Sequence, residues 1–476
     1  MSQRTRLTLI VVSLGAILAA QALVFAQVVS AGAASDYDEG TYLASVDALR
    51  HGQRLGAAVF ASQPPGWYQL LELLSLLTTR SVEAWRVWMV VIALLGTIAA
   101  FEVVRRLAGA VAGLIAAGLL GISPYYGDYA ARVVADVPAI SFTFAALAFA
   151  VAACRPRRWI PALAAGALFV CAVLIKLTAL TAVIPLIGLA IALRPRRGEV
   201  GAFAAGAAAV GLAAVVANAR ALGSLWAGAV TYHRLAARLT VVPNAGANRF
   251  RLREAYVHDG RTLFFWFVVA GVAALIALVA LRRAGLVWPL WLWPVVVAPV
   301  LVETRPLHEN HYTLLSASLV LPVGASLGAL LDGLRSVRLR AASLVIIAMA
   351  LTIGYVRTGR RLATASDHER DGPAVAWGVG RLRHGSGLVV TDQPILAYLA
   401  GRRVPGELVD TAVLRFDTGS LTDEMVLHVI DRDHVSVVTV GRAFRDRPAI
   451  LEGLRERYAR RSTRYGVTAF FDRRSS

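Results

Sequence analysis

Charged residues are scarce in this chain of 476 residues. They make up only 17% of it, whereas hydrophobic residues make up 57% and the mean hydropathy is +0.61. A soluble domain typically carries about 25% charged residues. The scarcity therefore excludes a soluble protein of this length and predicts a chain that crosses a membrane many times.

Cysteine and lysine are also rare. The cysteines, Cys154 and Cys171, fall at a predicted span end and inside a span, which argues against a disulfide between them. Lys176 is the only lysine, so arginine carries almost all of the positive charge. The formal net charge is +19, but the arginines stand in short clusters between apolar runs. We therefore expect membrane orientation signals and no nucleic-acid partner.

The apolar runs predict about eleven transmembrane helices. The first run covers residues 7–29, and the others cover 84–104, 108–124, 137–153, 159–175, 178–193, 200–217, 262–281, 286–302, 312–331 and 341–357. With this count, the arginine clusters at 105–106, 155–158, 194–197, 282–283 and 335–340 all fall on the side of the N-terminus. Such clusters mark the cytoplasmic side, so we expect a plasma (inner) membrane protein with a cytoplasmic N-terminus.

The loop at residues 31–83 is predicted to be extracytoplasmic and to contain two helices. The first covers 41–50, with Asp36 and Asp38 as candidate N-caps. The second covers 64–79, begins with two prolines and is too short for a span, which favours an interfacial helix.

The composition changes near residue 359. Short apolar runs at 388–390, 435–440 and 467–471 predict buried strands, and 393–400 and 448–460 predict helices. We therefore expect a transmembrane domain at 1–358 and a small extracytoplasmic α/β domain at 359–476. No glycine-rich strand-to-helix turn indicates a nucleotide site there.

Asp38, Glu39 and Asp136 are the candidate catalytic carboxylates. Asp38 and Glu39 lie in an acidic run beside long apolar flanks, where a carboxylate could take a proton from an attacking hydroxyl. Asp136 stands beside Pro138 at the outer start of a span. The alternatives are that Asp38 and Asp136 only cap helices, and that Arg132 forms an exposed salt bridge with Asp136.

Lys176 and one histidine-containing turn could bind an anion. Lys176 has apolar neighbours on both sides, which suggests a lipid phosphate as its partner, with a snorkelling side chain as the alternative. Near residue 308, the side chains that could contact a phosphate or sugar are Arg305, His308, His311 and Tyr312. The two histidines could also hold a metal, but no third strong ligand is near in sequence. The basic loop 218–260 favours an interfacial helix.

Several motifs resemble one family when they are taken in order. They are DYDEGTYLASVDALRHG from residue 36, QPPGWYQLL from 63, RRLAG at 105–109, SerPro at 123, the turn from Arg132 to Pro138, Lys176, and HisTyr at 311. This order is similar to that of the GT-C superfold, the integral membrane glycosyltransferases that include bacterial aminoarabinose transferases and protein O-mannosyltransferases.

The resemblance implies a GT-C-like fold and a sugar donor carried on a polyprenyl phosphate. It implies that Asp38 is the catalytic base with Glu39 beside it, that Asp136 lines the active site, and that no metal cofactor is required. Gln63 stands where the family usually has a lysine, at a position that would contact the donor. The acceptor would be a glycan, lipid or protein of the cell envelope, and the sugar a hexose or a pentose such as arabinofuranose.

Two alternatives belong to other classes. A transporter or lipid flippase would show internal repeats and ionisable residues near mid-membrane, and neither is evident in the sequence. A structural or sensory protein would act through its external domain, and deletion of residues 365–476 is expected to separate it from an enzyme.

Overall fold

The computed structural model describes residues 2–32, 36–154, 158–239, 241–258, 262–368 and 372–474. Residues 155–157 of one predicted arginine cluster therefore lie outside the described residues. The chain divides into two compact units. Unit 1 comprises Met1–Val29, Arg86–Val216 and Pro243–Thr364, and unit 2 comprises Ser30–Trp85, Ala217–Val242 and Ala365–Ser476.

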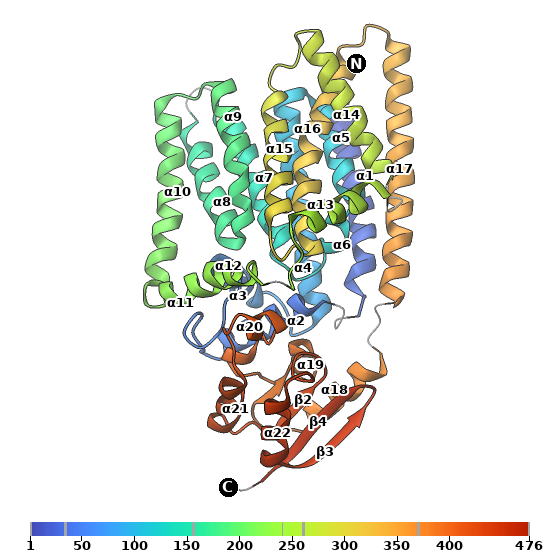
Figure 1. The fold of residues 1–476 in the computed structure, drawn as a ribbon. Coiled ribbons are helices and arrows are strands. Elements are labelled where there is room, and N and C mark those ends of the chain that lie inside the picture. Colours follow the sequence, from blue (N-terminus) through green and yellow to red (C-terminus); the bar gives the residue numbers. More distant parts are fainter. Residues whose placement is uncertain are drawn as a thin grey trace. The chain divides into compact units, whose positions relative to one another are not determined.

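Unit 1 is made of helices (Figure 1). In chain order they are α1 (Gln3–Val29), α4 (Val82–Ala108), α5 (Ala110–Ile122), α6 (Tyr126–Tyr129), α7 (Asp136–Ala153), α8 (Trp159–Ile175), η2 (Leu177–Ala182), α9 (Val183–Leu193), α10 (Arg197–Ala217), α13 (Ala245–Arg253), η5 (Glu254–His258), α14 (Thr262–Ala280), α15 (Trp288–Glu303), η6 (Glu309–His311), α16 (Tyr312–Asp332) and α17 (Val337–His368).

The long helices coincide with the predicted spans. Among the described residues, seven helices are long and apolar enough to cross a membrane, and four shorter apolar helical segments occupy the other predicted positions. A multi-pass membrane protein is therefore confirmed. The number of segments that cross the bilayer stays a prediction.

Small residues bring α5 and α16 into close contact. A Cβ atom added to Gly328 would lie 2.2 Å from the Ala112 Cβ, and one added to Gly324 would lie 2.6 Å from the Ala116 Cβ. Gly324 and Gly328 are four residues apart in α16, and so are Ala112 and Ala116 in α5, so each of these pairs lies on one face of its helix. Such small-residue faces allow helix backbones to approach closely inside a membrane.

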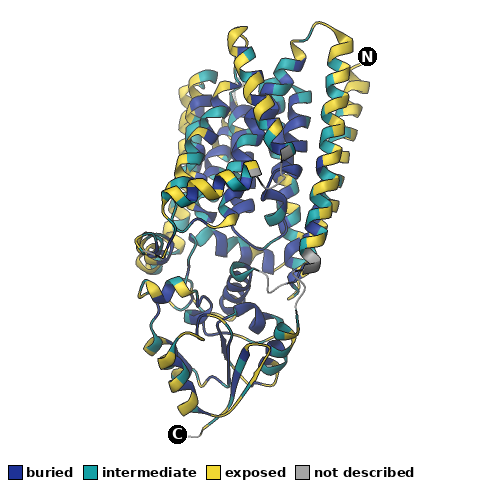
Figure 2. Cartoon of the chain, turned by 45° about the vertical axis from the view of Figure 1, so that its right-hand side comes forward, coloured by how far each residue is buried: buried dark blue, intermediate teal, exposed yellow. Residues whose placement is uncertain are grey.

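Other helices keep apolar side chains at the surface. In the most apolar windows of α10 and α17, only 6% of the residues are buried, and residues coloured as exposed recur along α17 (Figure 2). Because exposed apolar side chains are unfavourable in water, these surfaces fit contact with lipid.

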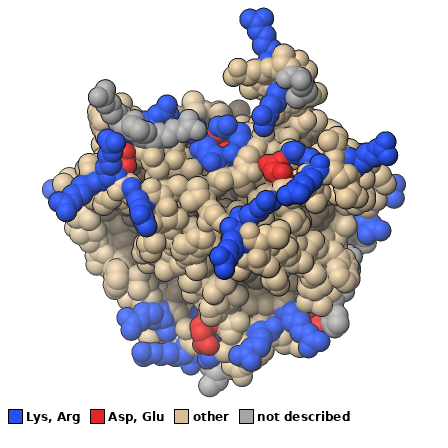
Figure 3. All heavy atoms as spheres, turned by 90° about the horizontal axis from the view of Figure 1, so that it is seen from above, with Lys and Arg blue, Asp and Glu red and all other residues tan. Residues whose placement is uncertain are grey.

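Several arginine-bearing turns meet at one end of unit 1. Arg340 forms an ion pair with Asp332, and the Arg283 guanidinium lies beside Gly333. A view onto this end shows basic side chains around the rim, with few acidic ones among them (Figure 3). The clustering agrees with the predicted pattern of arginine loops.

Unit 2 combines short helices with one sheet (Figure 1). Its elements are α2 (Tyr37–Arg50), α3 (Pro65–Ser75), η3 (Ala219–Ala221), α11 (Leu222–Trp226), η4 (Ala227–Thr231), α12 (Tyr232–Ala236), α18 (Pro373–Arg383), β1 (Val389–Thr391), α19 (Pro394–Leu399), η7 (Gly406–Leu408), α20 (Val413–Asp417), α21 (Asp423–Arg432), β2 (Val437–Val440), α22 (Pro448–Arg457), β3 (Tyr458–Arg464) and β4 (Val467–Arg473).

The sheet has the strand order β1-β2-β4-β3, in which β1 and β2 are parallel and the other pairs are antiparallel. β1, β2 and β4 confirm the three predicted apolar strands. The predicted helix 448–460 is wrong at its end, because α22 stops at Arg457 and β3 begins at Tyr458. β3 has no apolar run. It is a charged strand at the edge of the sheet and pairs antiparallel with β4.

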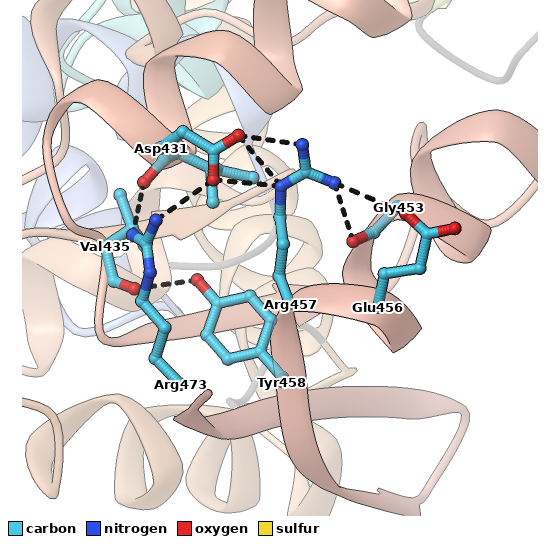
Figure 4. Close-up of polar contacts among 8 residues, drawn as sticks. Asp431, Val435, Gly453, Glu456, Arg457, Tyr458 and Arg473 are labelled. Atoms are coloured by element: carbon cyan, nitrogen blue, oxygen red, sulfur yellow. Dashed lines mark hydrogen bonds and ion pairs between the residues drawn. The ribbon is translucent and has the colours of Figure 1, made fainter. Parts of the chain in front are cut away.

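Ion pairs hold the junction between α22 and β3 (Figure 4). The Asp431 carboxylate accepts hydrogen bonds from the guanidinium groups of Arg457, at 2.7 Å, and Arg473, at 3.0 Å. The Tyr458 hydroxyl donates to the Val435 carbonyl oxygen at 2.7 Å. Side chains that are far apart in sequence thus fix a helix-to-strand change that local periodicity does not signal.

The predicted domain boundary at residue 358 stays a prediction. In unit 2, the segment from residue 365 onward is part of one compact body with the acidic loop, residues 30–85, and with residues 217–242.

Candidate active site

The only lysine of the chain forms a buried ion pair in unit 1. The Lys176 Nζ donates to Asp136 Oδ1 at 2.6 Å, and the two side chains are only 6% and 3% exposed. Lys176 lies in extended backbone where α8 ends and η2 begins, while Asp136 is the first residue of α7. The interruption of the helix at Lys176, between α8 and η2, lets its side chain reach the start of α7.

Asn310 completes this cluster. Its amide Nδ2 donates to Asp136 Oδ2 at 3.1 Å, so both carboxylate oxygens of Asp136 are engaged. The Asn310 Oδ1 is buried and has no hydrogen-bond partner among the described residues. Asn310 lies in η6, between His308 and His311. It therefore links the ion pair to the histidine-containing turn.

These contacts revise two alternatives for Asp136. The residue preceding it, Ala135, is the N-cap of α7, and the Asp136 side chain does not cap the helix. Asp136 is buried and forms an ion pair with Lys176, which contradicts an exposed salt bridge to Arg132. The snorkelling alternative for Lys176 is likewise wrong, because its side chain is buried against a carboxylate.

A cavity of about 650 Å³ opens beside the histidine-containing turn of unit 1. Its lining includes His308 and Tyr312 from that turn, Arg251 and Glu254 from the α13–η5 segment, and Tyr125. The Tyr125 ring packs edge-on against the Tyr312 ring at 4.8 Å. A cavity with cationic, acidic and aromatic side chains can accommodate a polar ligand such as a phosphate or a sugar.

Two features give this cavity a defined shape. The Asn248 side chain of α13 donates to the carbonyl oxygens of Val302, at 3.1 Å, and Thr304, at 2.8 Å, which fixes α13 to the end of α15. Tyr125 has a positive φ of 65°. Such a conformation is uncommon for a bulky residue and is often found at functional sites.

The other candidate residues of this turn, Arg305 and His311, are close in sequence to the lining residues of the cavity. The rings of His308 and His311 are 5.7 Å apart, and Arg305 lies 4.0 Å from the Glu303 carboxylate. No group of three or more histidine, cysteine, aspartate or glutamate side chains placed to hold a metal occurs in the described ranges.

Unit 2 holds the acidic candidates. Asp36 is the N-cap of α2, and its Oδ1 accepts from the backbone N–H groups of Asp38, at 2.9 Å, and Glu39, at 3.3 Å. Asp38 therefore lies in the first turn and is not the cap, which corrects that part of the prediction. The Glu39 side chain is buried, and Asp38 is half-buried.

The loop that follows α2 is anchored in the same unit. Gln63 is half-buried between Ser62 and the start of α3. The Ser62 N–H donates to the Tyr68 hydroxyl at 3.1 Å, and its carbonyl oxygen lies 2.8 Å from His233 Nε2. Burial raises the pKa of Tyr68, which keeps its hydroxyl protonated. The segment 217–242 thus supports the acidic loop, a role that the prediction of an interfacial helix did not include.

Four residues that contact the ion pair or line the cavity were not selected as candidates from the sequence: Asn310, Arg251, Glu254 and Tyr125. Asn310 lies inside the HENH run, so that run was the available signal for it. Arg251 and Glu254 belong to a basic loop whose composition favours contact with the membrane surface.

Comparison with known proteins places this geometry in context. Residues 62–219 match the family model described as dolichyl-phosphate-mannose-protein mannosyltransferase. No curated protein sequence matches the chain.

Solved structures match over most of the chain. ArnT from Cupriavidus metallidurans bound to undecaprenyl phosphate aligns with a TM-score of 0.68 and 13% identity, over 98% of each chain. The archaeal oligosaccharyltransferase AglB from Archaeoglobus fulgidus, in complex with an inhibitory peptide and a dolichol-phosphate, aligns with a TM-score of 0.52 and 13% identity. That match covers 96% of this chain and 74% of the archaeal one. The predicted GT-C fold is confirmed, and the family match favours a glycosyltransferase over a transporter or flippase.

Proposed function

We propose that this chain is a membrane glycosyltransferase that moves a sugar from a polyprenyl-phosphate donor to an acceptor hydroxyl, with inversion at the anomeric carbon. The observation that carries the proposal is the buried cluster of Lys176, Asp136 and Asn310. The fold and the family match of residues 62–219 support it.

The cluster suits a phosphate that acquires charge during the reaction. A lone ammonium buried among apolar helices would be costly, and the Asp136 carboxylate offsets that cost. An ammonium group has three N–H donors, and one of them is used by Asp136. The other two are proposed to donate to the oxygen atoms of the donor phosphate.

Asp136 is then a positioning residue and not a base. Both of its oxygens already accept hydrogen bonds, from Lys176 and from Asn310. Its proposed role is to keep Lys176 charged and correctly oriented. Asn310 fixes the second oxygen, and its buried Oδ1 is free to accept a hydrogen bond from a ligand hydroxyl.

Asp38 is the proposed base, with Glu39 beside it. The acceptor hydroxyl gives its proton to Asp38 as its oxygen forms a bond to the anomeric carbon. The bond from that carbon to the phosphate oxygen breaks, and polyprenyl phosphate leaves with the electron pair. Positioned bases of this kind typically contribute about 10²- to 10⁴-fold in rate.

The cavity beside His308 is the proposed site for the polar part of the donor. His308, His311, Tyr312 and Arg305 are proposed to contact the phosphate or sugar, and Arg251 adds a cation to the same lining. Arg132 and Gln63 are further proposed contacts. No divalent metal is needed for the chemistry in this proposal.

The proposed location is the plasma (inner) membrane, with the N-terminus in the cytoplasm and the α/β segment from residue 359 outside. The arginine-rich end of unit 1 supports this orientation. The acceptor is a glycan, a lipid or a protein hydroxyl.

The test has two stages. Mass spectrometry of lipids that copurify with the protein should detect a polyprenyl phosphate or its glycosylated form. Transfer of radiolabelled sugar is then measured in proteoliposomes from undecaprenyl-phosphate-linked mannose, glucose and arabinofuranose. The variant Asp38→Asn should insert normally and lose transfer. Lys176→Gln should also lose transfer when equal amounts of folded, inserted protein are compared. Full transfer by a well-inserted Asp38→Asn protein would exclude the proposed mechanism.

The proposal assigns the base to unit 2 and recognition of the phosphate to unit 1, so the two roles are tested separately. Asp38→Asn should abolish turnover but leave binding of undecaprenyl phosphate unchanged. Lys176→Gln should weaken that binding. If both variants bound the lipid as the unaltered protein does, Lys176 would have no role in recognising the phosphate.

A further inference from the structure

The tyrosine beside the proposed base is held by the C-terminal segment. The Tyr37 hydroxyl donates to Asp410 Oδ1 at 3.1 Å and accepts from the Thr411 N–H at 2.7 Å. Burial and the negative charge of Asp410 raise the pKa of Tyr37, so the hydroxyl stays protonated and can donate. Tyr37 stands directly between the N-cap residue Asp36 and Asp38.

A second contact holds the Tyr37 ring. The guanidinium carbon of Arg442 lies 4.9 Å from the ring centroid, a cation–π geometry. The Arg442 backbone is itself fixed, because its N–H donates to the buried Asp392 carboxylate at 2.6 Å, as does the Phe444 N–H at 2.9 Å. The ring and the hydroxyl of Tyr37 are therefore both contacted from the C-terminal segment.

Arg415 fixes the loop that carries Asp410. Its side chain is buried, and its guanidinium donates to the carbonyl oxygens of Asp410, Glu407, at 3.0 Å, and Ser420, at 3.2 Å. It also lies 3.8 Å over the Phe60 ring of the acidic loop. A guanidinium bound to three carbonyl groups allows the loop little freedom.

The backbones of the two segments approach closely as well. A Cβ atom added to Gly40, in the first turns of α2, would lie 2.7 Å from the Ile395 backbone nitrogen of α19. Only glycine fits this approach without a shift of backbone. The start of α2 is thus fixed by direct packing in addition to the Tyr37 contacts.

We propose that Tyr37 and Asp410 are positioning residues that hold Asp38 in place for the reaction. The C-terminal segment would then take part in setting the reaction geometry. The inference rests on the proposed function, because it assigns a task to residues next to the proposed base. A misplacement of about 1 Å can cost roughly 10²-fold in rate, so small changes at this contact should be measurable.

The experiment compares single hydroxyl and carboxylate variants. Tyr37→Phe removes the hydroxyl, Asp410→Ala removes its acceptor, and Asp410→Asn keeps an acceptor oxygen for Tyr37. Tyr458→Phe is the matched control, because the Tyr458 hydroxyl is also buried in unit 2 and donates to a backbone oxygen, that of Val435. All variants are assayed in proteoliposomes for kcat, for KM of the lipid donor and for binding of undecaprenyl phosphate.

Tyr37→Phe and Asp410→Ala should lower kcat by about 10- to 100-fold, with KM and lipid binding nearly unchanged. Asp410→Asn should restore most of the rate, and Tyr458→Phe should keep it. If Tyr37→Phe and Asp410→Ala retain the kcat of Tyr458→Phe while Asp38→Asn is inactive, the inference is wrong and the proposed function stands.

Two further outcomes are also decisive. If Asp38→Asn is itself active, the proposed function fails, and the inference fails with it. If Asp410→Ala does not insert into membranes, Tyr37→Phe measured against Tyr458→Phe decides the question, since each removes one buried hydroxyl.

Discussion

Removal of either partner of the Lys176–Asp136 pair should destabilise unit 1 far more than removal of both. The two side chains are nearly inaccessible, and their charged atoms are 2.6 Å apart. Leaving one charge buried without its partner typically costs about 3–5 kcal/mol. Asp136→Leu would also deprive the Asn310 amide of its acceptor, which adds about 1–3 kcal/mol.

The double variant Lys176→Met/Asp136→Leu should recover most of this loss. It removes both charges and replaces them with apolar side chains of similar length, a change that is often neutral or stabilising in other proteins. The two single variants together would lose about 6–10 kcal/mol or more, whereas the double variant should lose only about 1–3 kcal/mol, because the Asn310 amide still lacks its acceptor. The coupling free energy between the two substitutions is thus several kcal/mol, which unfolding experiments can measure.

The assay is denaturant unfolding in lipid nanodiscs, followed by tryptophan fluorescence, for all four proteins. Transfer activity is measured in parallel, and the double variant should be folded but inactive. Losses below about 1 kcal/mol in both single variants would match an exposed pair and would refute the argument from burial. A double variant that transferred sugar at the normal rate would remove Lys176 from the mechanism.

Three shorter predictions concern other parts of the chain. Gly328→Leu should lower the thermal stability of unit 1, because overpacking costs about 1–3 kcal/mol, whereas Gly211→Leu, with open space around it, should not. A hydrogen bond and the charge of Arg457 hold the pKa of Asp431 below its usual value. The stability that this carboxylate contributes is therefore present above the unfolded-state pKa of about 3.9. It is lost as the pH falls through the folded-state pKa. The difference in melting temperature between Asp431→Asn and the unaltered protein should therefore shrink below about pH 4, and an equal difference at all pH values would contradict this. His308→Ala should weaken binding of undecaprenyl phosphate by about tenfold, as expected for loss of one hydrogen bond to a charged group, and unchanged binding would exclude His308 as a contact.

The bundle helices were predictable because a local signal, a long apolar run, decides their structure. Long apolar runs fixed the positions of the bundle helices, since such runs have few other stable arrangements in a membrane. β3 was missed because its sequence, YARRSTR, has no apolar alternation. The bonds from Arg457 and Arg473 to Asp431 decide its position, and such distant pairings are not visible in a local window.

The candidate site was predictable by residue type but not by pairing. The only lysine and the acid near Pro138 were both singled out as candidates from their unusual setting, and the structure pairs them. Arg132 was considered as the partner of Asp136 because it is four residues away, whereas the true partner, Lys176, is forty residues away. Helix packing brings α7 and α8 together, and the sequence gives no direct measure of that packing.

The arrangement of unit 2 changes how the sensory alternative can be tested. Deletion of residues 365–476 was expected to leave an enzyme with its acidic loop intact. That segment supplies the Asp410 acceptor of Tyr37, the guanidinium over Phe60 and the Ile395 backbone against Gly40. Its removal would expose buried apolar and polar groups of the loop, and an enzyme and a sensor would then both lose function. Because Asp410→Asn and Asp410→Ala differ only in an acceptor oxygen and a few atoms of bulk, they separate a role in the reaction from a role in folding, which the deletion cannot do.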